Sequence, residues 1–131
     1  YPIRKKPRLR DEAFIKSGTE PTGLDPLSWA KSVETLGAGE ILLNSITFEG
    51  TMKGYDLSLI KLVSEKVQIP VIAMGGVGEL DHIPPAIIES GASAVAVGSV
   101  FHYTHITPNM VKEKLAESGI SVRLDNPEFV I

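Results

Sequence analysis

Apolar positions along the chain follow two alternating patterns, one typical of helices and one typical of buried strands. In the first helical segment, apolar residues recur at three-residue steps, which favours a helix with one apolar face; they are Leu27, Ala30, Val33 and Leu36. The next apolar segment, residues 40–46, contains an unbroken Ile-Leu-Leu run. Such a run is typical of a strand that is buried on both faces, as in a parallel sheet.

Capping residues mark where the helices are expected to begin and end. Asp25-Pro26 is predicted to open the first helix, because Asp is a good N-cap and Pro at the first helical position loses no hydrogen bond. Gly37 is predicted to end this helix. In the same way, Asp56 is expected to cap a second helix and Thr107-Pro108 a final helix that runs to Ser118.

Strands are predicted near residues 41–46, 71–74 and 93–97, with helical segments between them. The helix after residue 80 contains Pro84-Pro85, which is tolerated only in its first turn. The spacing of the strands, about 25–30 residues, is the size of a βαβ unit with parallel strands and right-handed crossovers. The predicted fold class is therefore α/β, with parallel (βα) units that form half of a TIM (βα)₈ barrel. An open flavodoxin-like sheet is the alternative.

Three segments are expected along the chain. Residues 1–18 form an irregular basic segment with the remnant of a hairpin, residues 19–123 form the (βα) half-barrel, and residues 124–131 form a C-terminal tail. Phe14–Lys16 is predicted to be a short strand or hairpin arm, followed by a loop at Thr19–Gly23. The chain has 131 residues, about half the usual length of a (βα)₈ barrel, and does not begin with Met. We therefore expect that it begins inside a longer reading frame or after processing.

The first ten residues carry five of the 13 Lys and Arg residues and no acidic residue, so the rest of the chain is acidic. A basic arm of this kind can bind RNA or DNA. No aromatic or Gly-rich nucleic-acid motif accompanies it, and the body of the chain has the opposite charge. We interpret the arm as a solvated or hairpin segment and expect no nucleic-acid partner.

Composition removes several other classes of protein. Apolar residues make up 43% of the chain, but no apolar run approaches the roughly 20 residues that span a bilayer. We expect no membrane association and, since no signal-peptide pattern is present, a cytoplasmic location. The absence of Cys excludes a disulfide, a thiol nucleophile and a thiolate metal site. The three His residues lack a metal-ligand spacing, so neither a metal nor another cofactor is expected.

Glycines follow two neighbouring predicted strands directly. Gly75-Gly76 comes after Val-Ile-Ala-Met, and Gly98-Ser99 comes after the next strand. Adjacent parallel strands end at the same edge of a sheet, so these turns place exposed backbone N–H groups side by side, as in the barrels that hold a phosphate after strands seven and eight. This position predicts the C-terminal half of a barrel and a phosphorylated small-molecule substrate. The alternative is that the glycines only make tight turns.

The loop after the first strong strand, residues 47–55, carries the candidate catalytic group. Glu49 could be a general acid or base if burial or a neighbouring carboxylate tuned it, and the alternative is a solvated loop glutamate. Asn44 and Ser45 end the strand and are candidate substrate-binding residues, although polar caps at strand ends are equally common. Lys53 could meet an anionic substrate.

Several of these segments resemble a known family, the cyclase subunit of imidazole glycerol phosphate synthase. Residues 37–46, 49–51 and 53–56 are similar to its sixth strand and the following loop. Residues 70–76 and 94–102 resemble its seventh and eighth strands. The similarity extends from about residue 17 to residue 123 and keeps the family's order of strand-end motifs.

The resemblance implies a (βα)₈ barrel enzyme of histidine biosynthesis. Members of the family take ammonia from a glutaminase partner through the barrel. They cyclise a bis-phosphorylated nucleotide to imidazole glycerol phosphate and release an aminoimidazole carboxamide ribonucleotide. Four residues of this chain match the family's second phosphate site, namely Gly75, Gly76, Gly98 and Ser99.

Four positions differ from the residues that the family usually carries. An aspartate is usual at Thr47 and Glu49, a threonine at Asn44, and a serine at Met74. The segments 44–46 and 51–56 are closer to a paralogous branch from surface-polysaccharide gene clusters. That branch is thought to deliver ammonia to an amidotransferase-dependent sugar modification.

Two function classes follow from these expectations. In the first, the parent protein is a cyclase–lyase fed with ammonia, in which Glu49 assists acid–base chemistry and the glycine turns anchor phosphate. The family's catalytic aspartates lie on its first and fifth strands, and this chain alone is expected to lack full activity. In the second class, the chain is a phosphate-binding half-barrel without turnover. Because half a barrel has two unpaired sheet edges and an apolar interior, a homodimer or a larger even-numbered assembly is expected.

Overall fold

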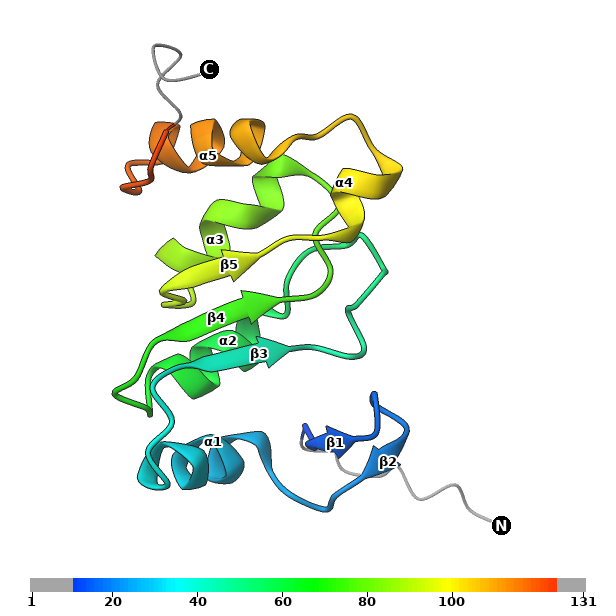
Figure 1. Ribbon diagram of the computed structural model, residues 1–131, viewed down its shortest axis with the longest axis vertical. Coiled ribbons are helices and arrows are strands. Elements are labelled where there is room, and N and C mark those ends of the chain that lie inside the picture. Colours follow the sequence, from blue (N-terminus) through cyan, green and yellow to red (C-terminus); the bar gives the residue numbers. More distant parts are fainter. Residues whose placement is uncertain (1–10, 125–131) are drawn as a thin grey trace, which may run out of the picture.

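A computed structural model of the chain describes residues 11–124, and its core is a three-stranded parallel sheet in the order β3-β4-β5 (Figure 1). A separate antiparallel hairpin precedes the first helix. The elements are β1 (Phe14–Ile15), β2 (Glu20–Pro21), α1 (Pro26–Thr35), β3 (Ile41–Asn44), α2 (Leu57–Ser64), β4 (Val71–Met74), the 3₁₀ turn η1 (Leu80–His82), α3 (Ile83–Ile88), β5 (Ala94–Ala96), α4 (Ser99–Tyr103) and α5 (Pro108–Glu117). Helices and strands alternate from α1 to β5, and α4 and α5 follow, which is the expected α/β fold with parallel (βα) units.

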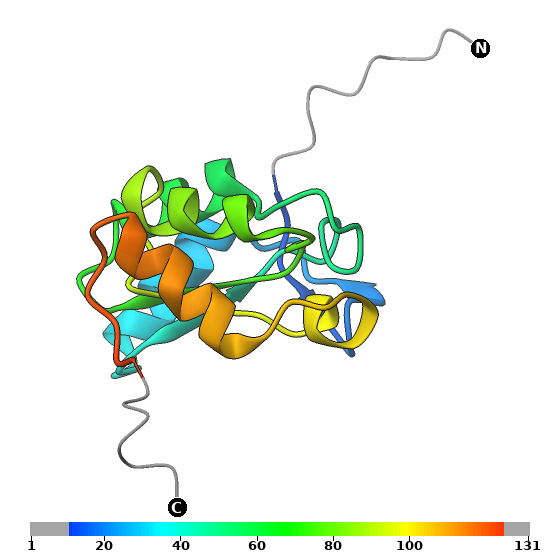
Figure 2. The same ribbon diagram turned by 90° about the horizontal axis from the view of Figure 1, so that it is seen from above.

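The register of the sheet sorts its side chains onto two faces. Leu43 pairs with Ala73, which pairs with Val95, and these three residues share one face. Helices α2 and α3 cover this face and lie on the same side of the sheet (Figures 1 and 2). Ala73 of β4 and Val63 of α2 are fully buried there. The hydrophobic core therefore lies between the sheet and these helices.

The opposite face of the sheet is open. Leu42, Ile72 and Ala94 share a row on this face, and Leu42 is 57% exposed. The expectation that the first strong strand is buried on both faces is therefore wrong for β3. The reason is that no element among residues 11–124 packs over this face, which corresponds to the interior of a closed barrel.

The N-terminal hairpin differs in detail from the sequence prediction. Phe14 pairs with Pro21 and Ile15 with Glu20, so the predicted loop at Thr19–Gly23 contains a strand. The reversal occurs at residues 16–18, which all have positive φ, and the Lys16 ammonium group lies 2.8 Å from a carboxylate oxygen of Glu20. The expected basic arm, residues 1–10, and residues 125–131 of the expected tail lie outside the described residues.

Most predicted helix ends are confirmed. The Asp25 carboxylate accepts a hydrogen bond from the Ser28 N–H at 3.0 Å, and the Asp56 carboxylate accepts one from the Leu59 N–H at 3.1 Å. Thr107 likewise caps α5. The third helical segment begins with η1, and the two prolines occupy the first turn of α3, where their missing N–H groups break no helical bond. No helix within residues 11–124 has the length and apolar character needed to cross a membrane.

Candidate functional site

The turns after β4 and β5 lie at the same edge of the sheet and open into one pocket. β4 and β5 are parallel and hydrogen-bonded, with Met74 paired to Ala96 at their carboxyl ends. The pocket has a volume of about 90 Å³, which is more than a single water needs. Its lining residues are Glu49, Met74, Gly75, Gly76, Val77, Ala96, Val97, Gly98 and Ser99. All four residues of the two predicted phosphate turns therefore meet at one site, together with Glu49.

The glycines after β4 are required by close packing as well as by backbone conformation. Gly75 and Gly76 have φ values of +96° and +106°. A Cβ on Gly76 would lie 2.0 Å from the Gly54 carbonyl oxygen, and one on Gly75 would lie 2.6 Å from the Asn44 side-chain oxygen. By contrast, a Cβ on Gly98 would meet no atom within 4 Å. Packing thus explains Gly75 and Gly76, whereas Gly98 borders open space at the pocket.

The loop that carries Glu49 is fastened to both pocket turns. The Gly54 N–H donates a hydrogen bond to the Gly76 carbonyl oxygen at 2.7 Å. The adjacent Tyr55 hydroxyl donates one to the Ala96 carbonyl oxygen at 2.9 Å. Tyr55 is buried, with 4% of its surface exposed. The sequence analysis missed this residue, because a tyrosine near a helix start gives no signal of a partner 41 residues further along the chain.

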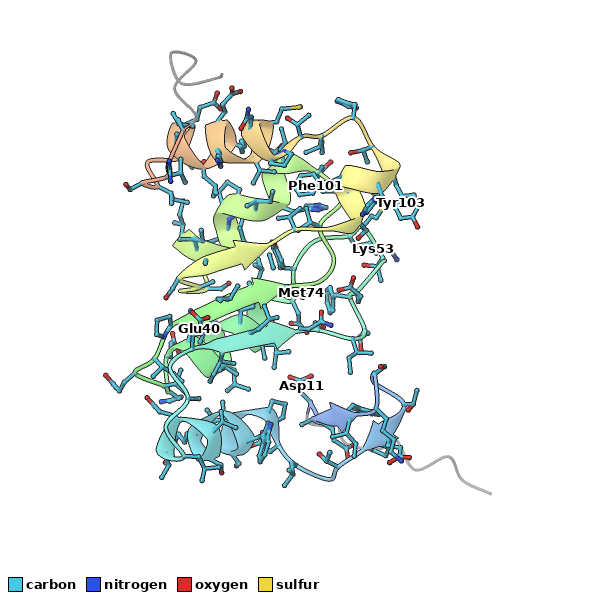
Figure 3. The ribbon with its side chains drawn as sticks, in the orientation of Figure 1. Asp11, Glu40, Lys53, Met74, Phe101 and Tyr103 are labelled. Carbon is cyan, nitrogen blue, oxygen red and sulfur yellow. The ribbon has the colours of Figure 1, made fainter. Side chains whose placement is uncertain are left out.

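Glu49 is exposed at the rim of the pocket, and its backbone N–H is fixed by a 2.9 Å hydrogen bond to the Ser45 carbonyl oxygen. Among the lining residues it is the one ionisable side chain. Lys53 is exposed and does not line the pocket (Figure 3). An anion in this pocket would therefore be held by N–H and hydroxyl donors, with a carboxylate beside it.

Asn44 and Ser45 do not line the pocket. Asn44 is exposed at the end of β3, with its side-chain oxygen beside Gly75. Ser45 is buried, and its hydroxyl donates a hydrogen bond to the Asp56 carboxylate at 3.3 Å. This bond links the end of β3 to the residue that caps α2, which is a structural role.

Two titratable groups near this end of the sheet have shifted pKa values. Burial raises the pKa of Tyr55, so its hydroxyl stays protonated and remains a donor. Partial burial, and then the nearby carboxylates of Asp56 and Asp25, raise the pKa of Asp11. Neither Tyr55 nor Asp11 lines the pocket.

The structure also places the histidines and the possible metal ligands. The Nδ1 atom of His82 accepts a hydrogen bond from the Gly78 N–H at 3.1 Å, and its Nε2 atom lies 3.4 Å from the Glu79 carboxylate. His102 and His105 are exposed. Within residues 11–124, no three His, Asp or Glu side chains gather in a way that could hold a metal ion.

Parallel strands that alternate with helices on one face, with a pocket at their carboxyl edge, define one half of a (βα)₈ barrel. The chain belongs to the family described as "Histidine biosynthesis protein", which matches residues 3–107. The match relates the chain to the histidine-biosynthesis family as a whole. It does not distinguish between the particular enzymes of that family.

Solved structures of longer chains have similar folds. The BexX/CysO complex of Amycolatopsis orientalis is similar with a TM-score of 0.55 and 23% identity, over 76% of this chain and 44% of that one. The (S)-3-O-geranylgeranylglyceryl phosphate synthase of Thermoplasma acidophilum, in complex with its substrate sn-glycerol-1-phosphate, is similar with a TM-score of 0.53 and 20% identity, over 70% and 36%. GGGPS from Thermoplasma volcanium has a TM-score of 0.53 and 20% identity, over 74% and 38%. The chain thus spans less than half the length of the structures it matches.

Proposed function

We propose that this chain is the phosphate-binding half of a (βα)₈ barrel enzyme and that its pocket receives a phosphate group of a small-molecule substrate. The observation that carries the proposal is the meeting of two strand-end turns, residues 75–76 and 98–99, at one pocket. Phosphate oxygens accept hydrogen bonds from backbone N–H groups and from hydroxyl groups, and the pocket is lined by both kinds of donor. The synthase from Thermoplasma acidophilum, which has a similar fold, was solved with a phosphorylated substrate, and this supports the same class of ligand here.

The finer proposal is a cyclase–lyase of the imidazole glycerol phosphate synthase type. In this reaction the glycine turns hold the distal phosphate, which fixes the substrate along the edge of the sheet. Glu49, at the pocket rim, moves a proton to or from the reacting part of the substrate. The chain spans less than half the length of the structures it matches, so the remaining catalytic groups belong to the other half of the barrel. A glutaminase supplies the ammonia, and the reaction takes place in the cytoplasm.

The paralogous branch that supplies ammonia for sugar modification is the second candidate. Residues 44–46 and 51–56 favour it, since these segments are closer to that branch than to the histidine-pathway enzymes. An assay with the bis-phosphorylated nucleotide and ammonium separates the candidates when the barrel is complete. Formation of the imidazole product supports the cyclase, and its absence from a complete barrel that binds phosphate supports the paralogue. Product formed by this chain alone would contradict the assignment of a half-barrel without turnover.

Replacing Ser99 with Ala is expected to weaken phosphate binding by about tenfold, because a hydrogen bond to a charged group is lost. The measurement is a titration of the full chain with inorganic phosphate, followed by calorimetry. Ser93→Ala is the matched control, since Ser93 is an exposed serine just before β5, at the end of the strand away from the pocket. Equal affinities for both variants and the unmodified chain would contradict the proposed pocket.

Replacing Glu49 with Gln is expected to have opposite effects on binding and turnover. Removal of the carboxylate beside the pocket relieves repulsion and tightens phosphate binding by roughly two- to fivefold. Loss of the proton-transferring group lowers turnover of the completed barrel by about 10²–10⁴-fold. Glu40→Gln is the control, because Glu40 lies just before the first residue of β3, at the end of the strand away from the pocket (Figure 3). Weaker phosphate binding in Glu49→Gln would show that this side chain is not a repelling neighbour of the anion.

A further inference from the structure

We propose that Tyr55 is a positioning residue that sets the place of the turn after β5, and with it the spacing between the two halves of the pocket. The proposal rests on the proposed phosphate function for its consequence, but its geometry is independent of that function. Gly54 and Tyr55 are neighbours in the chain, and each holds a different pocket turn. Gly54 bonds to Gly76 after β4, and Tyr55 bonds to Ala96 at the end of β5.

The hydrogen bond from Tyr55 acts on the backbone that leads directly into the pocket. Ala96 is the last residue of β5, and the pocket residues Val97, Gly98 and Ser99 follow it. On its other side, β5 pairs with no strand among residues 11–124. The turn after β5 is therefore restrained from the β4 side by the sheet and at the Ala96 carbonyl by the Tyr55 hydroxyl.

The surroundings of Tyr55 make it a rigid and permanent donor. Its ring is buried in the main hydrophobic cluster with Val77, Val100 and Ile106, so its position is fixed by packing. Its hydroxyl is protonated at neutral pH, as an unshifted tyrosine would be, and burial raises its pKa further. The bond from Tyr55 to Ala96 is partly buried, and a carbonyl that loses its donor there is costly to leave unpaired, so the Ala96 segment is expected to shift when the hydroxyl is removed.

The same bridge connects the pocket to the loop that carries Glu49. Residues 47–55 leave the end of β3 and return to the helix α2 through Gly54 and Tyr55. Further along the turn after β4, a Cβ on Gly78 would lie 2.1 Å from the Met52 carbonyl oxygen, so the loop and this turn are in direct backbone contact. A displacement of either pocket turn would therefore be transmitted to the Glu49 loop.

The test compares Tyr55→Phe with Tyr103→Phe in the full chain. Tyr103 lies on α4 and is 78% exposed, so it is a matched control that removes a hydroxyl without a buried partner (Figure 3). Phosphate titrations are made well below the melting temperature of both variants, where both are folded. Tyr55→Phe is expected to raise the dissociation constant for inorganic phosphate by roughly two- to tenfold. Tyr103→Phe is expected to leave it unchanged.

Amide chemical shifts of the ligand-free chain separate this proposal from the proposed function. Tyr55→Phe is expected to move the ¹H–¹⁵N signals of Gly98 and Ser99, and a role limited to stability would lower the melting temperature without moving them. Unchanged Gly98 and Ser99 signals overturn the positioning role, whether or not phosphate binds. If the unmodified chain binds no phosphate, the proposed function fails, and the ligand-free shifts still decide the role of Tyr55.

Discussion

Replacing Gly76 with Ala is expected to destabilise the fold by roughly 2–5 kcal/mol, because two separate costs combine. The backbone at Gly76 has a φ of +106°, a region that residues with a Cβ rarely adopt. The new Cβ would also lie 2.0 Å from the oxygen and 2.9 Å from the carbon of the Gly54 carbonyl group. These are backbone atoms, and they can move away only by breaking the 2.7 Å hydrogen bond from the Gly54 N–H to Gly76.

Urea unfolding followed by far-ultraviolet circular dichroism measures this loss as a shift of the midpoint. Gly39→Ala is the matched control, because a Cβ on Gly39 would meet no atom within 4 Å and its φ is not in the left-handed region. The control is expected to change the free energy of unfolding by less than about 0.5 kcal/mol. Equal midpoints for the two variants would show that the loop after β3 does not pack against the turn after β4 as described.

The packing at Gly76 helps to explain why some of the pocket positions are glycines. A tight turn and a phosphate site both favour glycine after a strand, so the sequence pattern leaves the two explanations open. Gly75 and Gly76 are explained by their contacts with Asn44 and Gly54, whatever ligand is bound. Gly98 has no such contact and no positive φ, so packing within residues 11–124 does not account for it. Gly98 is thus the glycine whose missing side chain bears most directly on access to the pocket.

The order of helices and strands could be predicted from the sequence because the residues that begin the helices act locally. Asp25, Asp56 and Thr107 act as caps through bonds to residues three positions later, and these short spacings are visible in the chain itself. Only the first strand of the hairpin was predicted, because the second strand has no local signal. Glu20-Pro21 has no apolar pattern of a strand, and its pairing with Phe14–Ile15 depends on the positive φ values at residues 16–18.

The position of the strand-end turns in the candidate site could be predicted from the sequence. The side-chain contacts between residues far apart in the chain could not. Strand order and register bring the turns at 75–76 and 98–99 to one edge, which the spacing of the strands already indicated. The different surroundings of Asn44 and Ser45 depend on the alternation of side chains along β3, which places Asn44 on the open face. The bond from Tyr55 to Ala96 crosses 41 positions and follows from tertiary packing alone.

The open face of the sheet leads to a proposal about assembly, in which a second copy of this chain takes the place of the other half of the barrel when the chain is on its own. Both outer strands, β3 and β5, lack a further strand partner within residues 11–124, and the row of Leu42, Ile72 and Ala94 is left without cover. An uncovered row of apolar residues and unpaired strand edges favour association. The chain spans 36–44% of the length of two barrel-sized structures that it matches, so two copies approach the size of one barrel.

Leu42→Lys is expected to weaken the homodimer at least about 100-fold, because a charged group without a partner would be buried in the completed interior. Sedimentation velocity at micromolar concentration is the measurement, with a dimer or larger even-numbered assembly expected for the unmodified chain. Leu36→Lys is the matched control, since Leu36 is 81% exposed at the end of α1 and lies outside the sheet. Leu42→Lys should sediment as a monomer at concentrations where the control remains assembled. A folded monomer of the unmodified chain at micromolar concentration would contradict the second copy, because the open face would then be stable in water without a partner.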